Sequence, residues 1–140
     1  MKYPVDKIRN ICLLGHHGSG KTSLAEALLY YTKGSERLGN TEEGTTICDF
    51  DPEEIRRKMS ISTSIAPVLW EDYKINILDA PGYFDFEGEE LQALSAAEYA
   101  IITVSARSGV KVGTEKAFKL CREKGIPAMF YVTKMDVDSG

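Results

Sequence analysis

The sequence predicts an α/β domain with a doubly wound, mostly parallel sheet and helices on both faces. Short apolar runs alternate with segments of helical periodicity along most of the chain. A glycine-rich stretch separates the first apolar run from the first helix, and polar segments follow the later runs. This pattern places a ligand site at the carboxyl ends of the strands. With 140 residues, 43% of them hydrophobic, one domain covering residues 1–140 is expected.

The first predicted elements are a strand, a tight loop and a helix. Residues 8–14 form an apolar run, residues 15–20 are rich in glycine, and residues 22–31 carry apolar side chains at helical spacing. From residue 34 to residue 64 the periodicity fades, and a charged cluster occupies residues 53–58. We therefore expect a long, mobile loop with one helical turn in this segment.

A hairpin follows this loop. Residues 65–70 and 74–78 have the composition of two strands, joined by a short polar turn at residues 71–73. Since hairpin strands run in opposite directions, the first of the two is expected to be an antiparallel edge strand.

The second half of the chain repeats the helix and strand alternation. Residues 87–97 are predicted to be a helix, residues 99–104 a buried strand, residues 113–124 a helix closed by Gly125, and residues 127–132 another buried strand. A domain of this pattern normally adds at least one more strand and helix after that point. We therefore expect a truncated amino-terminal part, with the carboxyl-terminal strand and helix missing.

Composition and charge exclude several classes of protein. The 17 basic and 21 acidic residues give a net charge of −4 and form no basic stripe, so no direct grip on nucleic acid is expected. The three cysteines are widely spaced and form no C-x-x-C pair, which favours reduced thiols in a cytoplasmic protein. No segment has the length and apolar composition of a signal peptide core or a membrane span.

The glycine-rich stretch matches the P-loop pattern G-x-x-x-x-G-K-[ST], in the strand and helix context that the pattern requires. In a P-loop, backbone N–H groups surround phosphate oxygens, Lys21 supplies a positive charge to the outer phosphates, and the Thr22 hydroxyl binds Mg²⁺. The predicted nucleotide-binding residues here are Gly15, His16, His17, Gly18, Ser19, Gly20, Lys21, Thr22 and Ser23.

A second polar motif, Asp79-Ala80-Pro81-Gly82, directly follows the apolar run of the hairpin's second strand. This position brings the Asp79 carboxylate beside the P-loop, where it can hold Mg²⁺ through water. Gly82 can offer its backbone N–H to the terminal phosphate without a side chain in the way. Alone, such a motif is usually only a turn; after a P-loop it predicts a phosphate and magnesium site.

A third motif, Thr133-Lys134-Met135-Asp136, follows the last predicted strand. Asp136 can accept two hydrogen bonds, from N1–H and the exocyclic amine of guanine, and adenine does not present this donor pair. The Lys134 stem can lie along the ring. The motif therefore favours GTP and GDP over ATP, and it makes Thr133, Lys134 and Asp136 the predicted base-binding residues.

With these three motifs in order, the chain resembles the translational GTPases, whose fold is a Ras-like P-loop NTPase. Two other stretches narrow the resemblance to elongation factor G: residues 49–60, which end in Arg57-Lys58-Met59-Ser60, and residues 108–115. The resemblance implies two switch segments, residues 34–64 and 79–90, that respond to the γ-phosphate. It also implies that Ser60 binds Mg²⁺ in the GTP state, with Thr22 and Asp79 as the other metal-binding residues.

Departures from the family pattern point to a paralogue of the housekeeping factor. Ser60 stands in place of threonine and keeps its hydroxyl, and Gly18 replaces the usual aspartate within the P-loop. Thr133 replaces the asparagine of N-K-x-D; this keeps one hydrogen-bonding group but is expected to lose the amide that ties the base loop to the P-loop. Tyr83 replaces the histidine that orients the attacking water, so Lys21 and Tyr83 are the predicted catalytic residues.

The resemblance implies magnesium-dependent GTP hydrolysis in an elongation factor G-like protein that acts on the ribosome. Three alternatives stay open: a module that senses GTP against GDP with negligible hydrolysis, a ribosomal-protection GTPase, and an ATP-using P-loop enzyme, which the Asp136 motif disfavours.

Several other residues have plain structural interpretations. His16 and His17 are expected to serve through their backbone amides rather than as metal ligands or acid–base groups. Trp70 is expected to cover the core or a sheet edge. The basic run Arg56, Arg57 and Lys58 is expected to be a solvated face, with an arginine supplied to the phosphates as the alternative.

Overall fold

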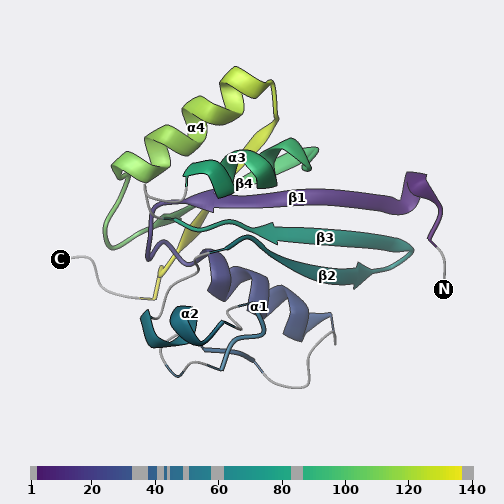
Figure 1. Ribbon diagram of the computed structural model, residues 1–140, viewed down its shortest axis with the longest axis horizontal. Coiled ribbons are helices and arrows are strands. Elements are labelled where there is room, and N and C mark those ends of the chain that lie inside the picture. Colours follow the sequence, from purple (N-terminus) through teal and green to yellow (C-terminus); the bar gives the residue numbers. More distant parts are fainter. Residues whose placement is uncertain are drawn as a thin grey trace.

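A computed structural model describes residues 3–32, 38–40, 43, 45–48, 51–57, 62–82 and 87–136 of the chain. The elements follow one another in the predicted order (Figure 1). They are a short 3₁₀ turn at Val5–Lys7, β1 (Ile8–Gly15), α1 (Lys21–Tyr31), α2 (Pro52–Arg57), β2 (Ser64–Trp70), β3 (Tyr73–Asp79), α3 (Glu87–Ser95), β4 (Tyr99–Ser105), α4 (Val112–Lys124) and β5 (Ala128–Thr133).

The strands form one five-stranded sheet in the order β2-β3-β1-β4-β5. The pairs β1–β3, β1–β4 and β4–β5 are parallel, and β2–β3 is antiparallel. This arrangement confirms the predicted mostly parallel sheet and the antiparallel strand at one edge. Because β1, β3, β4 and β5 all run the same way, their carboxyl ends lie at the same end of the sheet.

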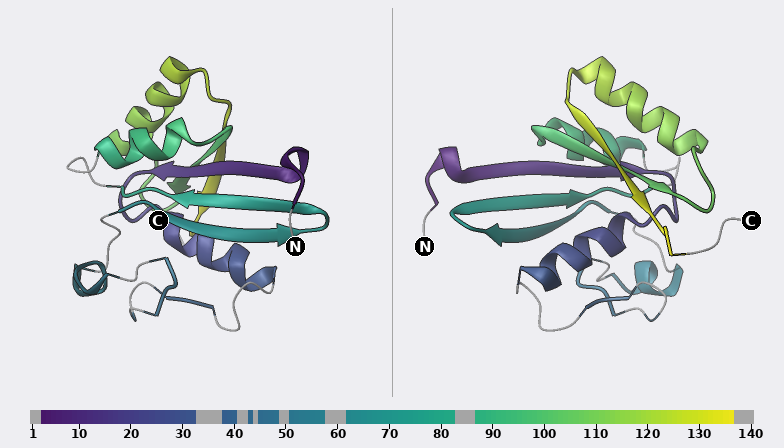
Figure 2. Two further views of the ribbon diagram at one scale, coloured as in Figure 1. Left: turned by 45° about the vertical axis from the view of Figure 1, so that its right-hand side comes forward. Right: turned by 180° about the vertical axis from the view of Figure 1, so that it is seen from behind.

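Helices cover both faces of the sheet, with α1 on one side and α3 and α4 on the other (Figures 1 and 2). The central strand β1 supplies both cores because successive side chains of a strand point to opposite faces. Leu13 packs with α1 residues such as Ala25 and Leu29, whereas Cys12 and Leu14 pack with α3 and α4. A strand buried on both faces needs a continuous apolar run, which explains why β1 is recognisable in the sequence.

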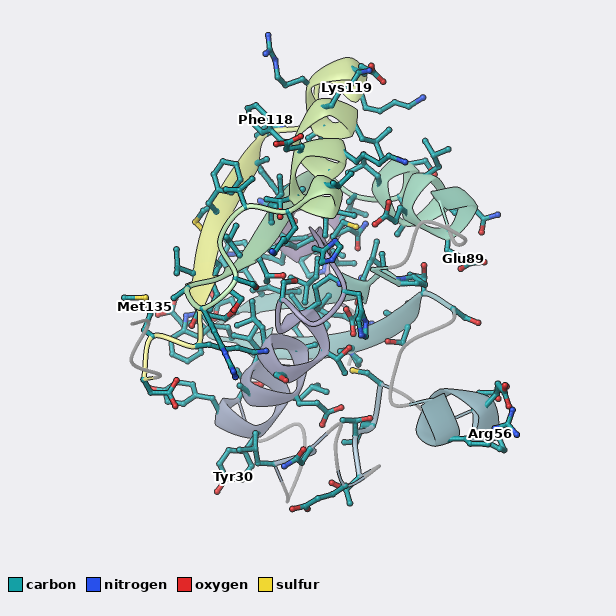
Figure 3. All side chains as sticks on the ribbon, turned by 90° about the vertical axis from the view of Figure 1, so that its left-hand side faces the viewer. Tyr30, Arg56, Glu89, Phe118, Lys119 and Met135 are labelled. Atoms are coloured by element: carbon teal, nitrogen blue, oxygen red, sulfur yellow. The ribbon has the colours of Figure 1, made fainter. Side chains whose placement is uncertain are left out.

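The last strand corrects one prediction. The apolar run 127–132 was expected to be a buried strand, but five of the six side chains of β5 are exposed. The reason is topological: β5 lies at the sheet edge, with β4 as its neighbour. Phe118 of α4 packs on Phe130 with ring centroids 5.6 Å apart, and α4 lies beside β5 in Figure 3.

The other sheet edge carries the tryptophan. Trp70, at the end of β2, stacks on Tyr31 at the end of α1 with ring centroids 6.1 Å apart and 29° between the planes. Its side chain stays 48% exposed. Trp70 therefore covers the edge between β2 and α1.

The segment between α1 and β2 contains the expected helical turn, α2. Arg56 points away from the rest of the domain (Figure 3) and pairs with Glu53 at 2.8 Å. Lys58 and the side chain of Arg57 lie outside the described residues. Part of this segment is packed, because Cys48 is only 4% exposed and belongs to the core beside α1.

Candidate functional site

The P-loop joins β1 to α1 at the carboxyl end of the sheet. Gly20 is the N-cap of α1 with φ of +97°, a left-handed conformation that L side chains rarely adopt. A Cβ on Gly15 would stand 2.6 Å from the Thr103 carbonyl oxygen and 2.9 Å from Ser19 Oγ. Glycine is therefore required at Gly15 by close packing beneath the loop as well as by the turn.

Lys21 opens α1 with its side chain folded back along the loop. Its Nζ donates to the carbonyl oxygen of Gly15 at 3.1 Å and to that of His16 at 3.4 Å, and the residue is only 7% exposed. This position holds a positive charge inside the loop, where the outer phosphates of a nucleotide bind. Thr22 is half-buried and Ser23 is exposed on the same helical turn.

Thr22 and Asp79 meet across the sheet end. The Thr22 hydroxyl donates to Asp79 Oδ2 at 2.6 Å, and Asp79 is fully buried at the end of β3. The pairing of β3 with β1 places Asp79 beside Leu13, two residues before the P-loop begins. A hydroxyl and a carboxylate are oxygen ligands of the kind that Mg²⁺ prefers, so the two residues fit the predicted metal-binding role.

Gly82 lies against the P-loop. The His17 N–H donates to the Gly82 carbonyl oxygen at 3.1 Å. A Cβ on Gly82 would collide with Lys21 Nζ and would stand 2.9 Å from the His17 nitrogen. The glycine of the second motif is therefore in direct contact with the phosphate-binding part of the P-loop.

The base loop is tied to the P-loop by two side chains. Thr133 Oγ1 donates to the Ser19 carbonyl oxygen at 2.6 Å, and Lys134 Nζ donates to the Gly18 carbonyl oxygen at 2.9 Å. The hydrogen-bonding group that Thr133 is expected to keep in place of the asparagine amide is its hydroxyl, and this hydroxyl reaches the P-loop backbone. Asp136 is exposed in the turn that follows β5. Met135, which marks the position of this turn, is labelled in Figure 3.

The two P-loop histidines make main-chain hydrogen bonds. The His16 carbonyl oxygen accepts from Ser19 N–H at 3.1 Å, and His17 N–H bonds Gly82. Burial, followed by the Lys21 charge, lowers the pKa of the His17 imidazole below its usual value, so this side chain is neutral near pH 7.

Two buried polar residues were not predicted from the sequence. Glu26 of α1 is fully buried, and its Oε1 accepts the N–H groups of Ile47 at 2.6 Å and Cys48 at 2.9 Å. Thr103 of β4 is also fully buried and bonds Ser19 Oγ at 2.6 Å. The only local signal was a polar residue inside an apolar pattern, which does not by itself identify the partner.

The structure thus brings together the P-loop, Asp79, Gly82 and the base loop at one end of the sheet. Ser60 and Tyr83, the remaining predicted site residues, lie outside the described residues. Within the described ranges, no helix has the length and apolar composition needed to span a membrane.

Comparisons with known proteins identify the family of the chain. Residues 6–140 match the Elongation factor Tu GTP binding domain family. The chain is 41% identical over 129 residues to an elongation factor G-like protein of Mycobacterium tuberculosis, covering 92% of this chain and 18% of that protein. It is 38% identical to the mitochondrial ribosome-releasing factor 2 of Scheffersomyces stipitis, over 95% of this chain and 16% of that protein.

A crystal structure of a protein from Thermus thermophilus is similar to this fold, with a TM-score of 0.92 and 48% identity. That match covers 96% of this chain and 20% of the crystallised chain. The chain therefore spans about a fifth of the length of the relatives it matches. The chain belongs to the Elongation factor Tu GTP binding domain family of translational GTPases, and its relatives include elongation factor G-like proteins.

Proposed function

We propose that this chain binds GTP and GDP together with Mg²⁺ and hydrolyses GTP, as the nucleotide-binding part of an elongation factor G-like protein that acts on the ribosome. The observation that supports this most is the meeting of Lys21, the Thr22–Asp79 pair and the base loop at one sheet end. Phosphate, metal and base ligands are then within reach of a single nucleotide.

Each residue has a distinct part in binding. Backbone N–H groups of residues 15–22 and the Lys21 ammonium hold the phosphates. Asp136 accepts from the guanine N1–H and exocyclic amine, and the Lys134 stem lies along the base. Thr22 and Asp79, with Ser60 in the GTP state, are the proposed Mg²⁺ ligands. The ion, when bound, neutralises charge on the β- and γ-phosphates.

Hydrolysis would be an in-line attack of water on the γ-phosphorus. The bond to the leaving β-phosphate oxygen breaks, and GDP and inorganic phosphate are released. Lys21 stabilises the charge that develops on these oxygens. We assign Tyr83 a hydrogen bond to the attacking water. A neutral phenol cannot place the positive charge of a protonated histidine, so intrinsic hydrolysis is expected to be slow.

The contact of Gly82 with the P-loop provides the nucleotide response. A γ-phosphate oxygen that bound the His17 N–H would compete with the Gly82 carbonyl oxygen, which accepts from that N–H at 3.1 Å. Binding of GTP would therefore move the segment that follows Asp79. We propose this movement as the response of the second switch to the γ-phosphate.

Competition against a fluorescent GDP tests the proposal. GTP and GDP should displace it in Mg²⁺ at far lower concentrations than ATP. Equal competition by ATP would support the ATP-using alternative instead. Single-turnover GTP hydrolysis by the full-length protein, with and without ribosomes, then separates a GTPase from a module with negligible hydrolysis.

A further inference from the structure

Three hydroxyl groups meet beneath the P-loop, and each comes from a different element. Ser19 belongs to the loop, Thr103 to β4 and Thr133 to the end of β5. Ser19 is 4% exposed and Thr103 is fully buried. Hydrogen bonds in such surroundings are strong, and a hydroxyl left without its partner there is costly.

The Ser19 and Thr103 hydroxyls are in direct contact and connect the P-loop to β1 through β4. Ser19 Oγ and Thr103 Oγ1 lie 2.6 Å apart, and Thr103 Oγ1 donates onward to the Leu14 carbonyl oxygen at 3.3 Å. A hydroxyl has one hydrogen to donate. Either hydroxyl of the Ser19–Thr103 pair could be the donor; when Thr103 donates to Leu14, Ser19 donates to Thr103, and the bonds then connect the P-loop through β4 to the end of β1.

Ser19 is held from two sides. Its side chain bonds Thr103, while its carbonyl oxygen accepts from Thr133 Oγ1 at 2.6 Å. The neighbouring Gly20 is in contact with Thr133 as well, since a Cβ there would stand 3.2 Å from the Thr133 methyl carbon. Any movement of Ser19 therefore breaks a bond to β4 or a bond to the base loop.

The sheet makes this arrangement rigid. β4 pairs with both neighbours at this level, so that Thr103 is beside Gly15 of β1 and Ser105 is beside Thr133 of β5. The phosphate-binding loop and the base-binding loop are thus fixed to the same strand, β4.

We propose that Ser19 and Thr103, acting with Thr133, are positioning residues that set the distance between the P-loop and the base loop and so determine how well Asp136 reads guanine. This inference rests on the proposed nucleotide binding. None of the three hydroxyls needs to touch the base, because their effect passes through the backbone of Ser19 and the start of the base loop.

The test compares GDP with inosine diphosphate, which lacks the exocyclic amine that Asp136 would bind. The quantity measured is the guanine preference of the full chain in Mg²⁺, which is the dissociation constant of inosine diphosphate divided by that of GDP. General destabilisation of the fold weakens the binding of both nucleotides equally and leaves this ratio unchanged, whereas displacement of the base loop lowers the ratio.

The variants are Thr103→Val, Ser19→Ala, their combination, Thr133→Val and Thr133→Ser. Each loss of a hydroxyl should weaken GDP binding about tenfold and lower the ratio of the inosine diphosphate dissociation constant to the GDP dissociation constant. The Ser19 and Thr103 double variant should match either single variant, because both remove the same bond. Thr133→Ser, which keeps the hydroxyl, should restore the parent ratio.

Thr32→Val is the matched control. The Thr32 hydroxyl donates to the Leu28 carbonyl oxygen at 2.8 Å, at the end of α1 remote from the P-loop, and its loss should not change the ratio. Ser19→Ala removes only one oxygen and replaces Thr103→Val in the test if the latter does not fold.

Parent-like ratios in the variants that lose a hydroxyl, or additive effects of the Ser19 and Thr103 substitutions, would overturn the inference while leaving nucleotide binding intact. A parent that binds no guanine nucleotide would overturn the proposed function itself.

Discussion

The Thr22 hydroxyl donates to Asp79 Oδ2 over 2.6 Å and so joins the first turn of α1 to the end of β3. Asp79→Asn keeps the size of the side chain and an acceptor for Thr22, but it removes the negative charge. We expect GTP affinity in Mg²⁺ to fall about tenfold to a hundredfold, measured by competition with a fluorescent nucleotide. The loss should vanish when the Mg²⁺ is chelated. Asp72→Asn, whose side chain is 81% exposed in the hairpin turn, should bind as the parent does in both conditions.

The base preference depends on a single carboxylate in our proposal. Asp136→Asn should shift preference from guanine to xanthine nucleotides, because the amide can donate to the xanthine oxygen but cannot accept twice from guanine. Competition of GDP and xanthosine diphosphate for the site measures this shift. Unchanged GDP affinity in this variant would refute the assignment of the base loop.

Gly82 has no space for a side chain against the P-loop. Gly82→Ala would bring a Cβ into Lys21 Nζ and close to the His17 nitrogen. The segment must then move away, and its N–H leaves the place proposed for contact with the γ-phosphate. We expect GTP affinity to fall more than GDP affinity. Gly88→Ala is the control, since a Cβ there meets no atom within 4 Å and alanine favours a helix. An equal loss for both nucleotides would argue against a γ-phosphate contact.

The exposed edge strand predicts self-association of the isolated chain. Met129, Phe130, Tyr131 and Val132 are each between 45% and 57% exposed, on a strand with an unprotected hydrogen-bonding edge. Sedimentation should detect oligomers that grow with concentration. Met129→Lys should shift the chain towards monomer because a lysine on an edge opposes strand pairing. Val5→Lys, at a residue 86% exposed and distant from β5, should leave the oligomers unchanged.

Local sequence predicted the elements and the P-loop because both are encoded by neighbouring residues. The apolar run of β1 and the glycines after it specify a strand and a turn with little help from the rest of the chain. The exposure of β5 was not predictable in this way, because the same apolar run can form either a central strand or an edge strand.

The polar contacts within the site were less accessible to sequence reasoning. Ser19 and Thr103 are 84 positions apart, and only the pairing of β1 with β4 brings them together. The same holds for Glu26, whose partners lie in a segment without periodicity. Thr133 is expected to keep a hydrogen-bonding group, but its partner, the Ser19 carbonyl oxygen, depends on backbone spacing that the sequence does not encode locally. The roles of Ser60 and Tyr83 stay predictions.

The buried cysteines allow local unfolding of the domain to be measured by the rate at which their thiols are alkylated. Burial raises the pKa of the Cys12 and Cys48 thiols, so alkylation needs both exposure and ionisation. Cys12 lies in the central strand, and its exposure requires the sheet to separate from α3 and α4. The Cys48 N–H donates to the Glu26 carboxylate, the side chain packs in the core beside α1, and the thiol becomes accessible when that short segment lifts from α1. Under native conditions Cys48 should therefore label well before Cys12. If nucleotide binding tightens this segment, the labelling rate of Cys48 alone should slow, which gives a readout of the first switch that needs neither ribosomes nor hydrolysis.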